Sequence, residues 1–246
     1  MSVSQTLPID LYFWTTPNGY KISIALEELA VPYVLRFVNI NRADQFKPEF
    51  LAISPNNRIP AIVDPEGPDG RPISVFESGA ILPYLGRKFG RLYPVEERAR
   101  VVVDEWLVWQ VANVGPVFGH YNHFNSYANE KVPYAITRFG DEAHRLFRVL
   151  DERLRGRDFV AGDYSIADMA IYPWIVPYER QGQKLEDFPQ LKRWFGAIRA
   201  RPAVVRAYDK AKEINPGQGG IRTAEERAIL FGQTAASVER AAADAR

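Results

Sequence analysis

The N-terminal forty residues alternate between strand and helix patterns. Residues 9–14 are short and rich in β-forming side chains, which is typical of a buried strand. Apolar residues then recur from Ile22 to Leu29 at helical spacing, after Thr16 as a suitable N-cap and Pro17 as a first helical residue. A second strand is predicted over 33–40. Strand, helix and strand within about 30 residues predict a βαβ unit with parallel strands.

The next segment predicts a hairpin followed by a helix. Residues 59–64 resemble a third strand with a proline near its start, and 73–76 resemble its hairpin partner across a turn-rich stretch. A helix is predicted over 78–89. Pro83 lies inside it and costs roughly 3 kcal/mol in a regular helix, so we expect a kink or a later start.

Beyond residue 92 the sequence contains helical patterns and no convincing strand. Gly115 and Pro116 should bend or end the first of these helices, and Ser165 with Asp168 forms a capping-box pattern. We expect an α/β domain over 1–92, an all-helical domain over 93–214 and a C-terminal extension over 215–246, either docked or mobile. The predicted helices cover 96–113, 134–154, 165–176, 190–201, 203–213 and, in the extension, 224–231.

Composition excludes several classes of function. The chain has no cysteine, which excludes disulfides, thiolate metal sites and a catalytic protein thiol. The formal net charge of +1 gives no indication of a nucleic-acid-binding surface. No apolar run is long enough to span a membrane, and residues 1–8 lack the pattern of a secretory signal. A cytoplasmic location is expected, with no membrane or nucleic-acid partner.

Several short motifs occur in a characteristic order. They are Thr-Pro-Asn-Gly-Tyr-Lys at 16–21, Gln-Phe-Lys-Pro-Glu-Phe at 45–50, Ser-Pro-Asn-Asn-Arg-Ile-Pro-Ala-Ile at 54–62, Phe-Glu-Ser-Gly-Ala-Ile at 76–81 and Trp-Gln-Val at 109–111. Together they resemble the glutathione transferase superfamily, and within it the bacterial nu class, a branch that includes disulfide-bond reductases. The resemblance covers roughly residues 9–211.

The resemblance implies a fold and a ligand. It implies a thioredoxin-like βαβ–ββα domain with a mixed four-stranded sheet, followed by an all-α domain. It also implies a homodimer that binds one or two glutathione molecules, or oxidised glutathione. By the same resemblance, Gln45 contacts the glycyl end, the Ile59 backbone before a cis Pro60 pairs with the cysteinyl part, and Arg138 reaches glutathione across a dimer interface.

The chemistry of glutathione suggests roles for the remaining motif residues. A thiol reacts as its thiolate, which a helix N-terminus stabilises through its N–H groups and partial positive charge. The Thr16 hydroxyl and the Asn18 amide are therefore candidate thiolate donors, although either could serve only in the turn and cap. Ser78 begins a helix and is a candidate anion site for the γ-glutamyl carboxylate, with Glu77 holding the ammonium group. Tyr12 is the alternative thiolate stabiliser.

These residues predict a glutathione-dependent disulfide-bond oxidoreductase that uses the thiol of bound glutathione. One alternative is a transferase that conjugates electrophiles or reduces organic peroxides. Another is a non-catalytic glutathione-binding or regulatory module. His120 and His123 have the spacing of metal ligands, but no third ligand is evident, so no metal site is expected. The predicted partner of glutathione is a small disulfide or electrophile.

Overall fold

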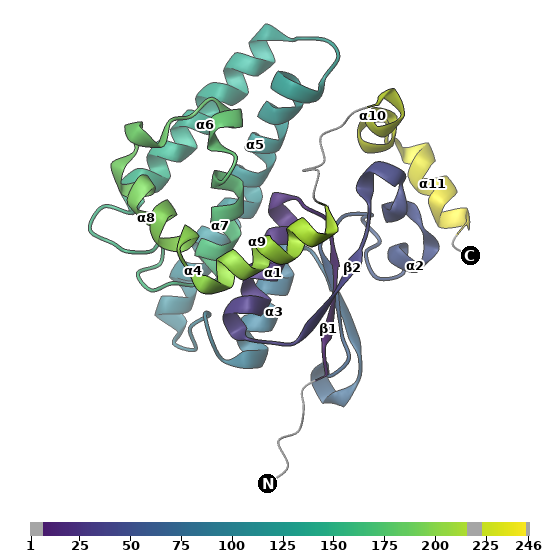
Figure 1. Cartoon of the computed structure of the whole chain (residues 1–246), viewed down its shortest axis with the longest axis horizontal. Coiled ribbons are helices and arrows are strands. Elements are labelled where there is room, and N and C mark those ends of the chain that lie inside the picture. The colour runs from purple at the N-terminus through teal and green to yellow at the C-terminus, as the bar shows by residue number, and fades with distance from the viewer. Residues whose placement is uncertain (1–6, 216–222, 245–246) are drawn as a thin grey trace. The chain divides into compact units, whose positions relative to one another are not determined.

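The computed structural model describes residues 7–215 and 223–244 (Figure 1). These residues form two compact units. The first contains the described residues up to Ile81 and those from Ala207 onward, and the second is Leu82–Arg206. The segment 216–222, which belongs to the predicted C-terminal extension, lies outside the described residues.

The first unit is built on a four-stranded mixed sheet. Its strands are β1 (Ile9–Phe13), β2 (Tyr33–Phe37), β3 (Ala61–Asp64) and β4 (Ile73–Phe76), in the order β2-β1-β3-β4. β1 pairs with β2 in parallel, whereas β3 is antiparallel to both β1 and β4. The predicted βαβ unit and mixed sheet are confirmed. β3 starts two residues later than predicted, after Pro60, which cannot donate a ladder hydrogen bond.

Successive side chains of β1 point to opposite faces of the sheet, and each face packs against apolar residues. Leu11 and Phe13 are fully buried. Tyr12 points to the other face and packs with a cluster that contains Phe50, Ile59 and Ala61. Helix α1 (Pro17–Leu29) is buried along most of its length, and it begins after an extended N-cap at Thr16, as predicted.

Short helical turns connect β2 to β3. They are η1 (Ile40–Arg42), η2 (Asp44–Phe46) and α2 (Pro48–Leu51), and a further turn, η3 (Pro68–Gly70), joins β3 to β4. These elements were not predicted, since three or four residues are too few to establish a helical period.

The C-terminal part of the chain contributes to the first unit. From Ala207 onward, helix α9 (Pro202–Ile214) packs beside α1: the Tyr208 ring stacks on Tyr20 at 4.0 Å, and Lys210 forms an ion pair with the buried Glu27. The pKa of Tyr20 is raised by this burial.

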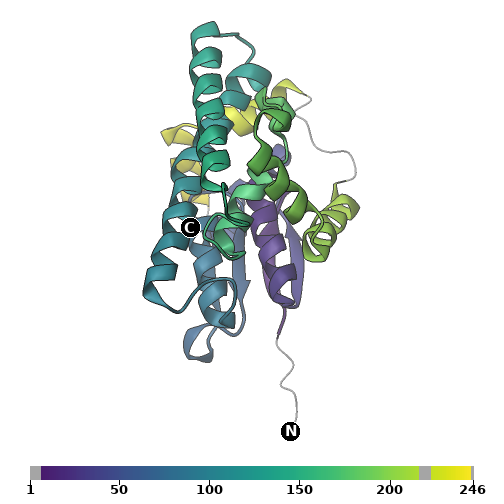
Figure 2. The ribbon, with the colours of Figure 1, turned by 90° about the vertical axis from the view of Figure 1, so that its left-hand side faces the viewer.

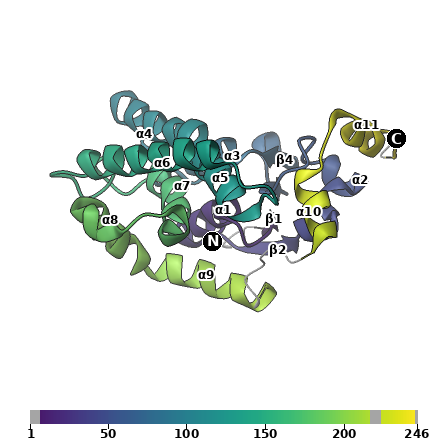
Figure 3. The same ribbon diagram turned by 90° about the horizontal axis from the view of Figure 1, so that it is seen from above.

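Two further helices belong to the same unit, α10 (Ala224–Phe231) and α11 (Ala235–Asp244). α10 contacts η1 and α11 contacts α2, as Figures 1 and 3 show. The Arg58 guanidinium also donates to Gln233 Oε1 at 3.0 Å. The predicted short helix at 224–231 is therefore confirmed, and the described part of the extension is docked rather than free; α11 was not predicted.

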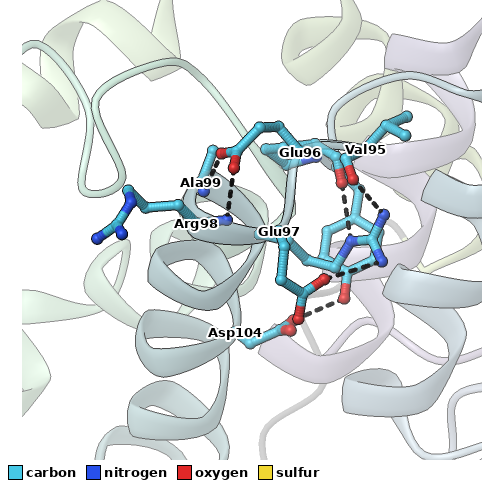
Figure 4. A network of polar contacts seen from close by, with 9 residues as sticks. Val95, Glu96, Glu97, Arg98, Ala99 and Asp104 are labelled. Carbon is cyan, nitrogen blue, oxygen red and sulfur yellow. Dashed lines mark hydrogen bonds and ion pairs between the residues drawn. The ribbon is translucent and has the colours of Figure 1, made fainter.

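Helix α3 (Ser78–Phe89) runs from the first unit into the second and begins at Ser78, so the later start allowed for Pro83 is wrong. The second unit continues with α4 (Glu97–Trp109). Its N-cap is Glu96, whose carboxylate accepts from the N–H groups of Arg98 and Ala99 at 3.0 and 2.8 Å (Figure 4). These two bonds lower the pKa of Glu96.

The expected bend at Gly115 and Pro116 takes a different form. Helical hydrogen bonding changes to the wider π type over η4 (Gln110–Val114), and α5 (Gly115–Asn122) then continues. Pro116 lies in the first turn of α5, a position that proline favours in helices. A second π segment, η5 (His123–Tyr127), follows, so a helix was missed where only a bend was predicted.

The remaining helices of the second unit are α6 (Pro133–Arg153), α7 (Ile166–Ile175) and α8 (Pro189–Arg199), with the short turns η6 (Tyr178–Gln181) and η7 (Leu185–Asp187). α5 and α6 lie side by side (Figures 1 and 2). The predicted capping box is present, with Ser165 and Asp168 bonded reciprocally. No helix within the described residues has the length and apolarity needed to cross a membrane.

Candidate functional site

The register of the sheet brings three of the predicted motifs to one edge. Ala61, the first residue of β3, is paired with Tyr12 near the end of β1 and with Phe76 at the end of β4. Thr16 follows β1, the Ile59–Pro60 dipeptide precedes β3, and Glu77 follows β4. Segments that are up to 61 residues apart in sequence, as Thr16 and Glu77 are, therefore meet at a single sheet edge.

Thr16 occupies the N-terminus of α1. Its backbone is extended, with φ −126° and ψ 159°, and its Oγ1 accepts a hydrogen bond from the Gly19 N–H at 3.3 Å. A hydroxyl that accepts one bond keeps its proton to donate elsewhere. Asn18 is the second residue of the helix and is half-buried. Both predicted thiolate donors therefore lie in the first turn or at its cap.

Gly19 allows this turn to approach β1 closely. A Cβ atom at this position would lie 2.4 Å from the Trp14 carbonyl oxygen and 3.0 Å from the Phe13 ring. On the other side of the turn, Asn215 Nδ2 donates to Thr15 Oγ1 at 2.8 Å. The placement of the α1 N-terminus is thus fixed by glycine packing and by a contact from the C-terminal part of the chain.

The Ile59–Pro60 peptide bond is cis, as predicted. Ile59 and Pro60 are both buried, and Ile59 belongs to the apolar cluster under Tyr12. The preceding loop is closed by Ser54 Oγ, which donates to the Arg58 carbonyl oxygen at 2.8 Å.

Glu77 and Ser78 mark the junction of β4 and α3. Glu77 has a left-handed backbone with φ 67°, which costs on the order of 1–3 kcal/mol for a residue with a side chain. Its carbonyl oxygen accepts from the N–H groups of Ala80 and Ile81, both at 2.9 Å, so Ser78 lies within the first helical turn. The Glu77 carboxylate is exposed and accepts from Asn56 Nδ2 at 3.4 Å.

A buried lysine, for which no role was predicted, contacts this junction. Lys21 is on α1 with only 2% of its surface exposed, and its Nζ donates to Ser78 Oγ at 3.1 Å. Burial lowers the pKa of Lys21 to about 7, while the charge of Glu77 acts in the opposite direction. The sequence feature that could have indicated a role for Lys21 is its position one residue before Ile22, inside the motif at 16–21.

Gln45 lies inside the η1–η2 loop with 1% of its surface exposed. Its Nε2 donates to the Ile40 carbonyl oxygen at 3.2 Å, whereas its Oε1 is buried and has no hydrogen-bond partner within the described part of the chain. A buried amide oxygen of this kind is unfavourable unless a donor reaches it.

Tyr12, the alternative thiolate stabiliser, lies in a packing environment. Its ring centroid is 5.9 Å from that of Phe50, and the side chain is half-buried against the apolar cluster. Tyr12 lies in the β1 strand itself, whereas Thr16 lies beyond the strand, at the N-terminus of α1.

Two predicted features lie in the second unit. Arg138 is on α6, is 60% exposed and pairs with Glu142 at 3.9 Å, so its contact with a ligand stays a prediction. His120 stacks on Phe139 with ring centroids 5.1 Å apart, which agrees with an aromatic environment. Among the residues that the structure describes, no group of three or more His, Cys, Asp or Glu side chains is placed to hold a metal ion.

Comparison with known proteins gives consistent matches. The model of the glutathione S-transferase N-terminal domain matches residues 16–88, and that of the C-terminal domain matches 138–202. The chain is 48% identical over 206 residues to the disulfide-bond oxidoreductase YfcG of Escherichia coli (strain K12), a match that covers 83% of this chain and 96% of YfcG.

Solved structures resemble the chain equally well. A glutathione transferase family member from Pseudomonas fluorescens pf-5, crystallised with two glutathione molecules, has 43% identity and a TM-score of 0.77, covering 84% of this chain and 94% of that one. A glutathione transferase from Pseudomonas putida, with one glutathione disulfide per subunit, has 38% identity and a TM-score of 0.78, covering 84% and 92%.

Proposed function

Because the chain belongs to the glutathione S-transferase family, we propose that it is a glutathione-dependent disulfide-bond oxidoreductase whose redox thiols belong to bound glutathione. The observation that carries this proposal is the convergence of Thr16, the cis Ile59–Pro60 bond and Ser78 at one sheet edge in a chain without cysteine. The similarity to YfcG selects disulfide reduction among the chemistries of the family. The order of motifs supports assignment to the nu class.

The polar groups at the edge match the parts of glutathione. The first turn of α3 offers N–H groups to the γ-glutamyl carboxylate, and the exposed Glu77 carboxylate offers a partner for the ammonium group. In this proposal the backbone of Ile59, before the cis bond, pairs with the cysteinyl part, and Gln45 in the η1–η2 loop is assigned to the glycyl end. The Thr16 hydroxyl and Asn18 amide then face the sulfur.

The reaction consumes two glutathione molecules for each disulfide reduced. The thiolate of the first attacks one sulfur of the substrate disulfide, which forms a mixed disulfide and releases the other half as a thiolate. The thiolate of the second glutathione then attacks the glutathione sulfur of the mixed disulfide. Oxidised glutathione and the second substrate thiol leave, and the two protons lost by glutathione end on the two product thiols.

The protein lowers the free energy of the attacking thiolate rather than supplying a nucleophile. The unperturbed pKa of a cysteine thiol is about 8.5, so most of the thiol is protonated near neutral pH. The Thr16 hydroxyl, the Asn18 amide and the helix N-terminus all favour the anion. Their combined effect increases the fraction of glutathione that can react.

The activity is tested by supplying glutathione and 2-hydroxyethyl disulfide and coupling the oxidised glutathione to glutathione reductase. Conjugation of 1-chloro-2,4-dinitrobenzene is measured in parallel. We expect strong disulfide turnover and weak conjugation. Dominant conjugation would instead identify a transferase, and binding of glutathione without either activity would favour a regulatory module.

Variants of the first turn test the thiolate mechanism. Thr16→Ala and Asn18→Ala should each lower disulfide turnover, and the mechanism is wrong if both retain activity within about twofold. Thr223→Ala is a matched control, because Thr223 caps α10 in nearly the same geometry and accepts from the Glu226 N–H at 3.1 Å.

We also propose the assembly and location that the resemblance implies. The protein is a cytoplasmic homodimer in which Arg138 contacts glutathione bound to the partner subunit. The domain division at about residue 92 belongs to the same proposal. Arg138→Ala should raise the KM for glutathione without changing the dimer mass measured by light scattering, and an unchanged KM would remove Arg138 from the site.

A further inference from the structure

Lys21 is the buried cation next to the predicted γ-glutamyl subsite. It joins α1 to the first turn of α3 through the 3.1 Å bond from its Nζ to Ser78 Oγ. Lysine is almost never fully buried without a compensating partner. Its position beside a helix N-terminus, which itself carries partial positive charge, is unfavourable unless an anion offsets both charges.

The chemistry of the two groups fixes the direction of this bond. An ammonium group has three donors and no acceptor, so while Lys21 is protonated Ser78 Oγ must accept from it. The single hydroxyl proton of Ser78 is then available to donate to another group. A neutral amine can accept a hydrogen bond, so loss of the Lys21 proton allows the Ser78 proton to turn inward.

Near neutral pH both forms of Lys21 are populated, since burial brings its pKa to about 7. The ionisable group that acts on it is Glu77, at the junction of β4 and α3, whose charge favours the ammonium form. A carboxylate bound at the first turn of α3 would add a second negative charge next to Ser78. By the same electrostatic argument it would favour the protonated lysine further.

We propose that Lys21 is a positioning residue for glutathione: its ammonium group orients the Ser78 hydroxyl toward the γ-glutamyl carboxylate, and carboxylate binding is coupled to uptake of one proton by Lys21. The proton comes from solvent, and no bond of the ligand is broken. This inference rests on the proposed function, since it takes glutathione as the ligand.

The proton uptake is measured by titration calorimetry with S-methylglutathione in buffers of different ionisation enthalpy. The methyl group removes the thiol proton, so thiol ionisation does not contribute to the signal. From the pKa of Lys21, uptake should rise from about 0.1 proton at pH 6 to about 0.8 proton at pH 7.5. Absence of uptake at the higher pH in the wild-type protein would overturn the inference without any variant.

Three variants separate positioning from a structural effect. Lys21→Met should abolish the uptake and weaken binding at pH 6 by about tenfold or more. Lys21→Arg should retain binding but lose the pH dependence, because guanidinium does not titrate in this range. Lys192→Met, an exposed lysine on α8, should behave as the wild type. Unchanged uptake in Lys21→Met would assign the proton to another group and refute the proposal.

The proposed function and this inference fail in different ways. If the wild type reduces disulfides and binds S-methylglutathione with no proton uptake, the proposed function is correct and the proposed role of Lys21 is wrong. If the wild type binds neither glutathione nor its S-methyl derivative, both are wrong.

Discussion

Replacing Thr16 by valine removes the side-chain hydroxyl and keeps a branched side chain of the same shape. In the structure this hydroxyl accepts from the Gly19 N–H, which leaves its proton available for the proposed hydrogen bond to the glutathione sulfur. Thr16→Val should therefore raise the pKa of the bound thiol. Thr16→Ser keeps the hydroxyl and should leave that pKa close to the wild-type value.

The size of the effect follows from the strength of one charge-assisted hydrogen bond. Such a bond contributes about 1.5–3 kcal/mol, and one pKa unit corresponds to about 1.4 kcal/mol, so the thiol pKa should rise by about 1–2 units. Loss of the N-cap is a separate effect and should lower the free energy of unfolding by about 1 kcal/mol. Thr223→Val, at the equivalent cap of α10, controls for the second effect alone.

The thiol pKa is measured from the ultraviolet absorbance of the thiolate in the glutathione complex as a function of pH. The pH dependence of kcat for disulfide turnover should shift upward in Thr16→Val by the same amount. A shift below about 0.3 units, with glutathione still bound, would show that backbone groups alone stabilise the sulfur and would return Tyr12 to consideration.

Three further substitutions have defined consequences. Asp168→Asn at about pH 4 should lower the free energy of unfolding by about 2–4 kcal/mol, because the amide nitrogen faces donors that now bind a carboxyl oxygen. Burial raises the pKa of Asp168 to about 6, so the free energy of unfolding of the wild-type protein falls as the pH rises from about 4 through 6. Urea titrations should therefore show that the difference in unfolding free energy between the wild type and Asp168→Asn becomes smaller over this pH range. Gly19→Ala should destabilise the protein by about 1–3 kcal/mol and lower disulfide turnover, because the added Cβ displaces the first turn of α1; unchanged melting and turnover would contradict this packing argument. Lys210→Met removes the cationic partner of the buried Glu27 carboxylate and leaves the hydrogen bond from the Tyr33 hydroxyl; it should cost about 1–3 kcal/mol in chemical denaturation, whereas the exposed pair lost in Lys192→Met should cost less than about 1 kcal/mol.

Local sequence signals accounted for most of the regular elements. β1 and α1 were predictable because apolar periodicity, an N-cap threonine and a following proline agree with one another. The π segment at Gln110–Val114 was not, because its hydrogen bonds depend on packing against neighbouring helices and leave no mark in the residue types. α11 was missed because its sequence is rich in alanine and charged residues and offers only one large apolar side chain, Val238, to mark a buried face.

The site was predictable where short motifs carry a mechanism. Thr16 was found as an N-cap and Pro60 through its motif, and the structure gives both the expected local geometry. Lys21 was missed because a single lysine next to an apolar face normally lies on the solvent side of a helix. Its burial and its tertiary contact with Ser78, 57 residues away in sequence, distinguish it from an ordinary surface residue.

Thr16 and Ser78 use the same physical device at two helix N-termini. Each hydroxyl accepts a hydrogen bond from a donor that the fold supplies, the Gly19 N–H in one case and the Lys21 ammonium in the other. Acceptance from these donors leaves each hydroxyl proton available to another acceptor. In the proposed complex that acceptor is a thiolate at one helix end and a carboxylate at the other. The two differ in one respect: an amide donor is permanent, whereas an ammonium donor titrates, so only the carboxylate end should respond to pH near neutrality.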